Sequence, residues 1–175
     1  MRKFSLGFTL IELLVVLGIL GILAAGLLAA IDPFEQLKKG RDTSLRNTVI
    51  ELLNGFTRYY ATHGGLPWCP AGVCSTIATV QLSDTVFWDE TTGYLQDLID
   101  DGELKSEFRT GLGTTNAGRI YMTSTEPTEV IICFMPDSKS LRNDDTVQYD
   151  ADGAINATKD CSTTTTTNGC YWCAR

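Results

Sequence analysis

An unbroken apolar run near the N-terminus dominates the hydrophobic pattern of the chain. From Leu13 to Ile31 there is no charged and no strongly polar side chain. A helix over these positions would be roughly 28 Å long at about 1.5 Å per residue, which is close to the hydrocarbon thickness of a bilayer. Glu12 stands at the start of the run, and an ionisable group at membrane depth costs roughly 2.5–3.5 kcal/mol, so it needs a partner. The pattern predicts a transmembrane helix that carries one functional acid.

A second helical pattern follows the apolar run. Pro33 lacks a backbone donor and clashes with the preceding turn, so a kink or stop is expected near residues 29–33. Over about residues 34–62, apolar side chains then recur at spacings of three and four, as in a helix with one buried face. These residues are Leu45, Val49, Leu52, Phe56 and Tyr59. Residues 38–44, Asp42 included, are interpreted as a solvated polar collar just outside the membrane, and Gly64 and Gly65 end the helix.

The remainder of the chain changes period and predicts a small, mostly antiparallel sheet. The expected elements are a helix over about residues 91–101, capped by Thr91, and strands over 119–123, 129–134, 146–149 and 171–174. Asp150–Gly153 is typical of a turn, and residues 75–90 support no firm prediction. The fold class is therefore α+β, with a long helix packed through its apolar stripe on a sheet.

Charge and cysteine content place the part after the apolar run outside the cytoplasm. The formal net charge is −7, which argues against binding of a nucleic-acid backbone as the main role. All six cysteines follow the apolar run, as expected for disulfides in an oxidising compartment. Arg2 and Lys3 precede the run and place the N-terminus in the cytoplasm.

The first seven residues are too short for a secretory signal with its own apolar core. A basic leader that ends in Gly7 is followed by Phe8-Thr9-Leu10-Ile11-Glu12 and the apolar run. This arrangement resembles the class III signal of type IV pilins and pseudopilins. The resemblance implies cleavage between Gly7 and Phe8 by prepilin peptidase, N-methylation of Phe8, and assembly into a helical filament. It also implies a pilin fold, divided into a leader (1–7), a transmembrane and assembly helix (8–31), its amphipathic continuation (32–63) and a globular head (64–175).

The same resemblance assigns roles within the N-terminal helix. Glu12 is expected to pair with the Phe8 amine of a neighbouring subunit, because each charge alone is costly in hydrocarbon. The alternative is a carboxylate at the membrane edge that is protonated or reaches toward the headgroups. Small residues four apart would let another helix approach closely; these are Gly21, Ala25 and Ala29. In filaments of the family, the region that includes Pro33 is where the helix can loosen.

The cysteines favour disulfides, although many pairings can be written for six of them. We expect Cys69–Cys74 from proximity, Cys161–Cys170 as a loop closure and Cys133–Cys173 as a link between adjacent strands. The spacing of Cys170 and Cys173 leaves the pairing open. Redox chemistry there is disfavoured because no helix follows to lower a thiol pKa. A zinc site built from Cys69, Cys74, Cys170, Cys173 and His63 is disfavoured against disulfides.

Other candidate chemistry is weaker. Asp144, Asp145, Asp150 and Asp152, with Gly153, suggest a calcium loop, but no Glu follows at the offset of an EF-hand, so acids in surface turns are the favoured interpretation. Thr163–Thr167 would be either an O-glycosylated tip or an exposed loop, and Asn156-Ala157-Thr158 matches the glycosylation triplet. No catalytic set emerges around the single histidine. We expect no enzymatic activity and no cofactor.

These observations predict a structural subunit of a type IV pilus that supports adhesion, motility or DNA uptake. Its partners would be other copies of itself, prepilin peptidase, an inner-membrane assembly platform and, before assembly, membrane lipid, without direct nucleic-acid binding. The protein would begin as a single-pass inner-membrane protein and end in an extracellular or envelope filament. The alternatives are a pseudopilin of a type II secretion or competence system and a minor binding subunit at the filament tip. An anchored enzyme is disfavoured.

Overall fold

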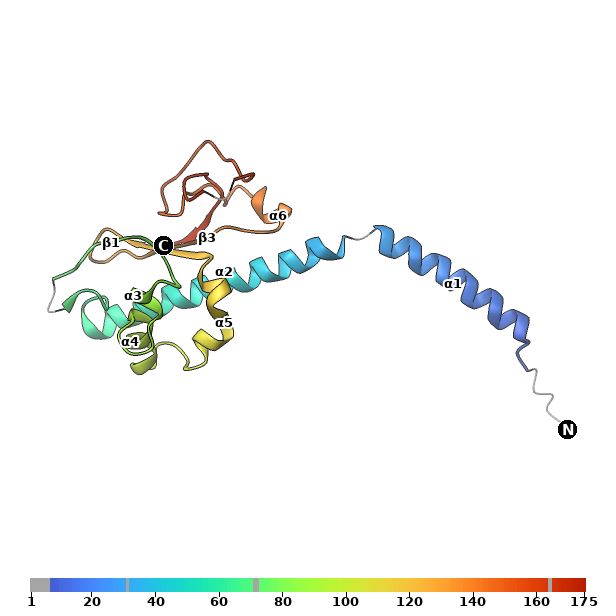
Figure 1. Ribbon diagram of the computed structural model, residues 1–175, viewed down its shortest axis with the longest axis horizontal. Coiled ribbons are helices and arrows are strands. Elements are labelled where there is room, and N and C mark those ends of the chain that lie inside the picture. The colour runs from blue at the N-terminus through green and yellow to red at the C-terminus, as the bar shows by residue number, and fades with distance from the viewer. Residues whose placement is uncertain (1–6, 31, 71–72, 164) are drawn as a thin grey trace. The chain divides into compact units, whose positions relative to one another are not determined.

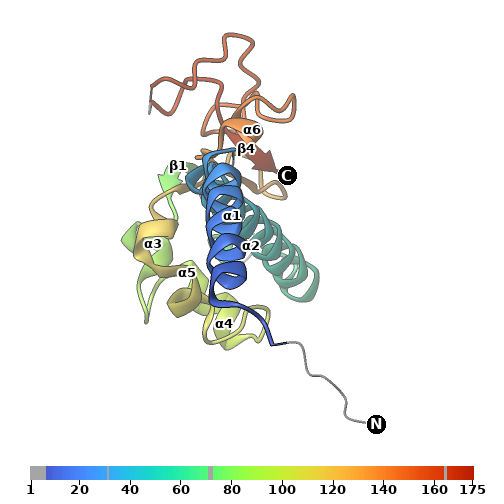
Figure 2. The same ribbon diagram turned by 90° about the vertical axis from the view of Figure 1, so that its right-hand side faces the viewer.

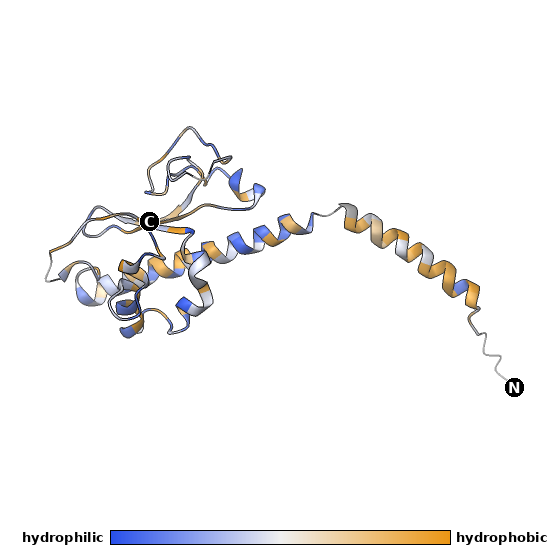
Figure 3. Ribbon diagram, viewed as in Figure 1, coloured by the Kyte–Doolittle hydropathy of each residue, from blue (hydrophilic) through white to orange (hydrophobic). Residues whose placement is uncertain are grey.

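The computed structural model describes residues 7–30, 32–70, 73–163 and 165–175, which divide into two compact units, 1–37 and 38–175. The first unit contains α1 (Leu10–Ala30) and the first residues of α2 (Pro33–His63). Figure 3 shows that α1 is apolar over nearly its whole length, as the sequence predicts. The described side chains from Phe8 to Leu28 are all exposed, so no described residue of the first unit covers this helix.

The helical interruption expected near residues 29–33 lies between Ala30 and Pro33, and Ile31 falls outside the described residues. Asp32 caps α2, because its Oδ1 accepts the backbone N–H groups of Phe34 and Glu35 at 3.1 and 3.2 Å. Pro33 occupies the first helical position, where a missing N–H is tolerated. The chain therefore restarts a new helix here instead of bending a continuous one.

The second unit is built on a four-stranded antiparallel sheet in the order β1-β2-β3-β4. The strands are β1 (Ile77–Gln81), β2 (Ile120–Ser124), β3 (Ile131–Phe134) and β4 (Trp172–Ala174). The predicted β2–β3 hairpin is confirmed. The strand expected over residues 146–149 is wrong: Tyr149 makes only isolated bridges, to Ile155 and Tyr171.

One face of the sheet packs against α2 and forms the main core. The predicted stripe supplies Leu45, Val49, Leu52 and Phe56, each at most 3% exposed, whereas Tyr59 is only partly buried. Trp68 lies beside Phe56 and is 2% exposed. Each such side chain contributes roughly 1.5–3 kcal/mol when it is withdrawn from water, so the amphipathic half of the helix anchors the head.

Short helices line the same core. They are α3 (Thr85–Trp88), α4 (Tyr94–Asp100) and α5 (Phe108–Ala117), and Figures 1 and 2 show them grouped together. The expected start of α4 at Thr91 is wrong. Asp89 Oδ1 accepts both the backbone N–H and the hydroxyl of Thr91 and of Thr92, at 2.7–3.0 Å. These bonds hold Thr91 in a turn, and Gly93 becomes the cap residue.

The opposite face of the sheet carries a smaller core. Cys133, Ala151 and Tyr171 are buried there, with Tyr121 and Tyr149 packed against them. In both Figures 1 and 2, the segment that follows α6 (Lys139–Arg142) lies on the far side of the sheet from α4 and α5. The expected turn at 150–153 is present: Gly153 has φ 83°, and a Cβ there would lie 2.5 Å from Ile131 Cγ2.

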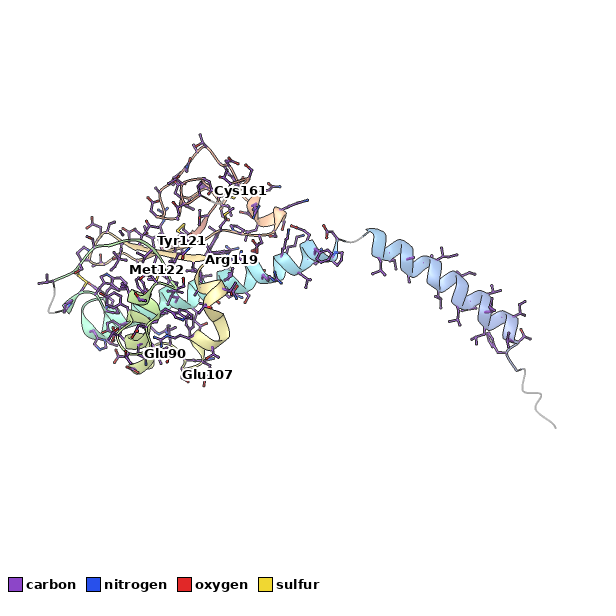
Figure 4. All side chains as sticks on the ribbon, in the orientation of Figure 1. Glu90, Glu107, Arg119, Tyr121, Met122 and Cys161 are labelled. Atoms are coloured by element: carbon purple, nitrogen blue, oxygen red, sulfur yellow. A yellow bond between two sulfur atoms is a disulfide. The ribbon has the colours of Figure 1, made fainter. Side chains whose placement is uncertain are left out.

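Asp42 corrects the interpretation of residues 38–44 as solvated. Its side chain is buried, and its two carboxylate oxygens accept the backbone N–H groups of Asp137 and Ser138 at 2.9 and 2.7 Å. Arg119, labelled in Figure 4, lies 3.9 Å from Asp42 and 2.9 Å from the Asp137 carboxylate. A buried carboxylate is tolerated only when hydrogen-bonded or paired, and here it ties α2 to the loop after β3.

We predict that Asp42→Ala destabilises the head by roughly 2–5 kcal/mol, because the buried Ser138 N–H and the part-buried Asp137 N–H lose their acceptor and Arg119 loses a nearby anion. The matched control is Asp145→Ala at an exposed position, with an expected change within about 0.5 kcal/mol. Denaturant unfolding of the full chain in detergent measures both. Equal unfolding midpoints for the two variants would contradict this role.

Tyr171 generates a pH prediction. Burial, helped by Tyr121 and the negative charge of Asp150, raises the pKa of Tyr171 from 10.0 to about 12. The fold thus favours the neutral phenol, so its contribution to stability is present below about pH 10 and is lost as the pH rises through about 12. Tyr171→Phe should flatten this alkaline loss in unfolding experiments, while Tyr60→Phe at an exposed position should not. Ionisation of Tyr171 near pH 10 in the folded wild-type protein would refute this prediction.

Candidate functional site

The backbone around the expected cleavage point lies outside any helix. Gly7, Phe8 and Thr9 precede α1 and are exposed, Phe8 at 77%. A Cβ built on Gly7 would meet nothing within 4 Å. Peptidases act most readily on exposed backbone that is free of secondary structure, and the Gly7–Phe8 peptide bond has both properties.

Thr9 and Glu12 form a reciprocal cap on the first turn of α1. Glu12 Oε2 accepts the Thr9 backbone N–H at 3.0 Å and the Thr9 hydroxyl at 2.8 Å. In return, Thr9 Oγ accepts the Glu12 N–H at 3.3 Å. This is a capping box, which satisfies orphan donors at a helix N-terminus. Among the described residues, both hydrogen bonds to the Glu12 carboxylate go to Oε2, and no cation pairs with it.

The surface of α1 is apolar and exposed in the first unit. It is long and apolar enough over Leu10–Leu28 to cross a membrane. Gly21 and Ala25 are exposed on it, and a Cβ on Gly21 would meet nothing within 4 Å. Ala29 has no described side chain, and Pro33 lies at the start of the next helix. Lipid or other apolar helices are the two environments that suit such a surface.

The head contains three disulfides, which pair Cys69 with Cys74, Cys133 with Cys173 and Cys161 with Cys170. These are the same three pairs that the sequence analysis chose. Cys161, labelled in Figure 4, belongs to the loop that follows α6. No described cysteine is free, which leaves no thiol for the zinc site or for redox chemistry at Cys170 and Cys173.

The acidic residues of the C-terminal segment serve its turns. Asp144 Oδ1 accepts hydrogen bonds from the hydroxyl and the N–H of Thr146. Both bonds lower the pKa of Asp144, and the bond from the hydroxyl has the larger effect. Asp150 Oδ1 accepts from the Asn156 amide and the Gly169 N–H at 2.9 and 2.8 Å. Within the described residues no three potential metal-ligating side chains gather.

The two candidate glycosylation positions differ in environment. Asn156 is partly buried, and its Oδ1 accepts the N–H and hydroxyl of Thr158 while its Nδ2 donates to Asp150. The described threonines of the run 163–167 are exposed instead. Asn156 is therefore engaged in holding its loop, whereas the threonine run stays a prediction for a modified or flexible tip.

Comparison with known proteins identifies the N-terminal segment. Residues 2–28 match the family model described as the prokaryotic N-terminal methylation motif, which is the class III signal peptide of type IV pilins and pseudopilins. No curated protein and no solved structure matches the chain significantly. The motif covers the leader and most of α1, and the head is consistent with an α+β pilin fold. The motif thus supports a type IV pilin-like or pseudopilin precursor.

Two residues that matter to this arrangement escaped the sequence analysis. Thr9 was noted only as part of the motif, although Thr followed three positions later by Glu before an apolar run is a known capping-box signature. Asp42 carried no such local signal, because its partners Asp137 and Ser138 are about 95 positions away.

The motif implies processing by prepilin peptidase. The open space around Gly7 allows a substitution that tests the position of the cleaved bond. Gly7→Val should leave the folded head unchanged and yet block cleavage, because the added Cβ meets no described atom within 4 Å and the expected clash is with the peptidase. Gly40→Val is the control, since a Cβ there also meets nothing within 4 Å. Intact-mass analysis of membranes should find precursor for the first variant and processed chain for the second. Normal cleavage of Gly7→Val would refute the assignment of the scissile bond.

Proposed function

We propose that this chain is a structural subunit of a type IV pilus, cleaved between Gly7 and Phe8, methylated on the Phe8 amine and polymerised through α1. Before assembly it is held in the inner membrane by α1 with its N-terminus in the cytoplasm. The assembled filament then carries the head outside the membrane and serves adhesion, motility or DNA uptake. Its partners are other copies of itself, the peptidase and the assembly platform.

The observation that carries this proposal is the hydrogen-bonding geometry of the Glu12 carboxylate at the start of an exposed apolar helix. The carboxylate is oriented by Thr9 through Oε2, and within the described residues nothing donates to Oε1. Cleavage converts the Phe8 amide nitrogen into a cationic amine. An amine from a neighbouring subunit can therefore bind Oε1 without breaking the cap. Pairing relieves both charges of the cost of lying in hydrocarbon.

The rest of α1 supports the same assembly. Its exposed apolar surface includes small residues, Gly21 and Ala25, that permit close helix contact. In a bundle of identical helices this surface is covered by copies of itself, so the environment changes little when a subunit leaves the lipid. The axial position of each helix is then set by the amine and Glu12.

A displayed pilin is favoured over a pseudopilin by the C-terminal segment. Residues after α6 cover the outer face of the sheet, are joined by the Cys161–Cys170 disulfide, and expose the threonine run. A polar layer that is cross-linked by a disulfide suits a surface exposed outside the cell. Mass spectrometry of sheared surface filaments tests this choice. A dominant chain beginning with N-methyl-Phe8 supports the major pilin, and trace abundance supports a pseudopilin or a minor tip subunit.

Substitutions at Glu12 separate its charge from its capping role. Glu12→Gln keeps an oxygen that can accept from Thr9, because Gln also serves in capping boxes, but it removes the anion. We expect Glu12→Gln and Glu12→Ala both to lower filament yield by about tenfold or more, since losing one member of a buried charge pair costs about 2 kcal/mol or more. Thr9→Ala removes hydroxyl bonds and keeps the charge, so its yield should stay within about twofold.

Filaments are counted by electron microscopy and by the yield of sheared protein, and membrane fractionation verifies that each variant is inserted. Normal filament numbers for Glu12→Gln would refute the charge-pair role of this residue. A loss in Thr9→Ala as large as that in Glu12→Gln would show that the cap, and not the charge, is what assembly needs.

A further inference from the structure

The disulfides of the head are nested along the chain. Cys133 pairs with Cys173, and the Cys161–Cys170 disulfide lies wholly inside that loop. Joining the cysteines two by two in chain order would give Cys133–Cys161 and Cys170–Cys173 instead. Only Cys69–Cys74 is native under that rule.

Chain statistics favour the non-native pairs before the head folds. The probability that two positions meet falls as about the 3/2 power of their separation. Cys133 is 28 residues from Cys161 and 40 from Cys173, which gives the wrong partner an advantage of about 1.7-fold. Cys170 is three residues from Cys173 and nine from Cys161, so its non-native partner is again the nearer one. Emergence of the chain from the N-terminal side adds to the first of these, because Cys161 reaches Cys133 before Cys173 exists outside the membrane.

The folded head has no place for the Cys170–Cys173 bond. Cys170 is fully buried in the main core, on the α2 side of the sheet. Cys173 packs in the smaller core on the opposite face, directly across from Cys133 in the β3–β4 register. Side chains three apart in an extended segment point to opposite faces. A chain that has closed Cys170–Cys173 therefore cannot dock β4.

We propose that the head reaches its native disulfides by isomerisation, and that a thiol–disulfide isomerase of the cell envelope is a required partner of this chain. The inference rests on the proposed placement of the head outside the membrane. It goes beyond the filament role, because it concerns how the head of the subunit acquires its native disulfides. Oxidation by a dithiol oxidase supplies the first disulfides, and the isomerase only exchanges them.

The exchange balances without net oxidation. The isomerase thiolate attacks Cys173 Sγ, which breaks Cys170–Cys173 and releases the Cys170 thiolate. Cys170 then attacks Cys161 Sγ, forming Cys161–Cys170 and expelling Cys133 as a thiolate. Finally Cys133 attacks Cys173 in the mixed disulfide, forming Cys133–Cys173 and returning the isomerase thiolate. Two protein disulfides are present before and after. Docking of β4 and burial of Cys170 in the main core drive the sequence forward.

The test expresses the full-length chain in a bacterial host with and without its periplasmic thiol–disulfide isomerase. Free thiols are blocked at lysis, and disulfides are mapped by mass spectrometry of unreduced peptides. We expect the native Cys133–Cys173 and Cys161–Cys170 peptides to fall at least about twofold without the isomerase, because the closure statistics favour the wrong partner of Cys133. Peptides linked through Cys133–Cys161 or Cys170–Cys173 should appear in their place, while Cys69–Cys74 stays unchanged.

Two double variants are the matched controls. Cys161→Ser with Cys170→Ser leaves only pairs that are native when joined in order, and so does Cys133→Ser with Cys173→Ser. The remaining native disulfide of each should form equally with and without the isomerase, so failure of one variant to fold leaves the other to decide. Native pairs in undiminished yield in the wild-type chain without isomerase would overturn the inference and leave the filament proposal intact. Six reduced cysteines in both hosts would overturn the external placement and this inference with it.

Discussion

The structure depends on one constraint: the surface of α1 cannot remain in water. Thirteen large apolar side chains between Leu10 and Leu28 are exposed. At roughly 1.5–3 kcal/mol for each, leaving them hydrated would cost about 20–40 kcal/mol, which exceeds the 5–15 kcal/mol that stabilises a typical domain. Under the proposed function, the helix must therefore pass from one apolar environment to another without crossing water. A bilayer before assembly and a bundle of identical helices afterwards satisfy this requirement, and both agree with the methylation motif at residues 2–28.

The head meets a different requirement, because its sheet is covered on both faces from a limited length of chain. The helix side is closed by ordinary apolar packing around Phe56 and Trp68. The other side is closed by an irregular segment whose contacts are few and whose backbone turns are held by Asp144, Asp150 and Asn156. A disulfide joins this segment to itself, and a second one joins β3 to β4. Cross-links that limit the unfolded ensemble are an effective support where apolar burial is small.

Features with a strong local period could be predicted from sequence, and features made by distant contacts could not. The apolar run and the stripe through Leu45 and Phe56 repeat over many turns, so their interpretation as helices holds. The short helix α5 was missed because Gly111 and Gly113 interrupt its pattern, and Gly113 has φ 71°. Asp42 looked like its solvated neighbours, and only the loop at residues 137–138 buries it. In α1 and the residues before it, the motif could be identified from the sequence, whereas the geometry of the Glu12 carboxylate could be seen only in the structure.

That geometry bears on how processing and assembly are linked. In the precursor, the nitrogen of Phe8 is an amide and carries no charge, while Glu12 is already held by Thr9 in one orientation. A group that is fixed before binding loses less conformational entropy when its partner arrives. Under the proposed function, removal of the leader creates a cation at Phe8 and removes Arg2 and Lys3 in the same step. The Glu12 carboxylate is thus oriented in every copy, whereas the Phe8 amine that it binds exists only on processed copies. An unprocessed subunit can accept an amine from a neighbour but cannot offer one, so a chain of such contacts would stop at that subunit.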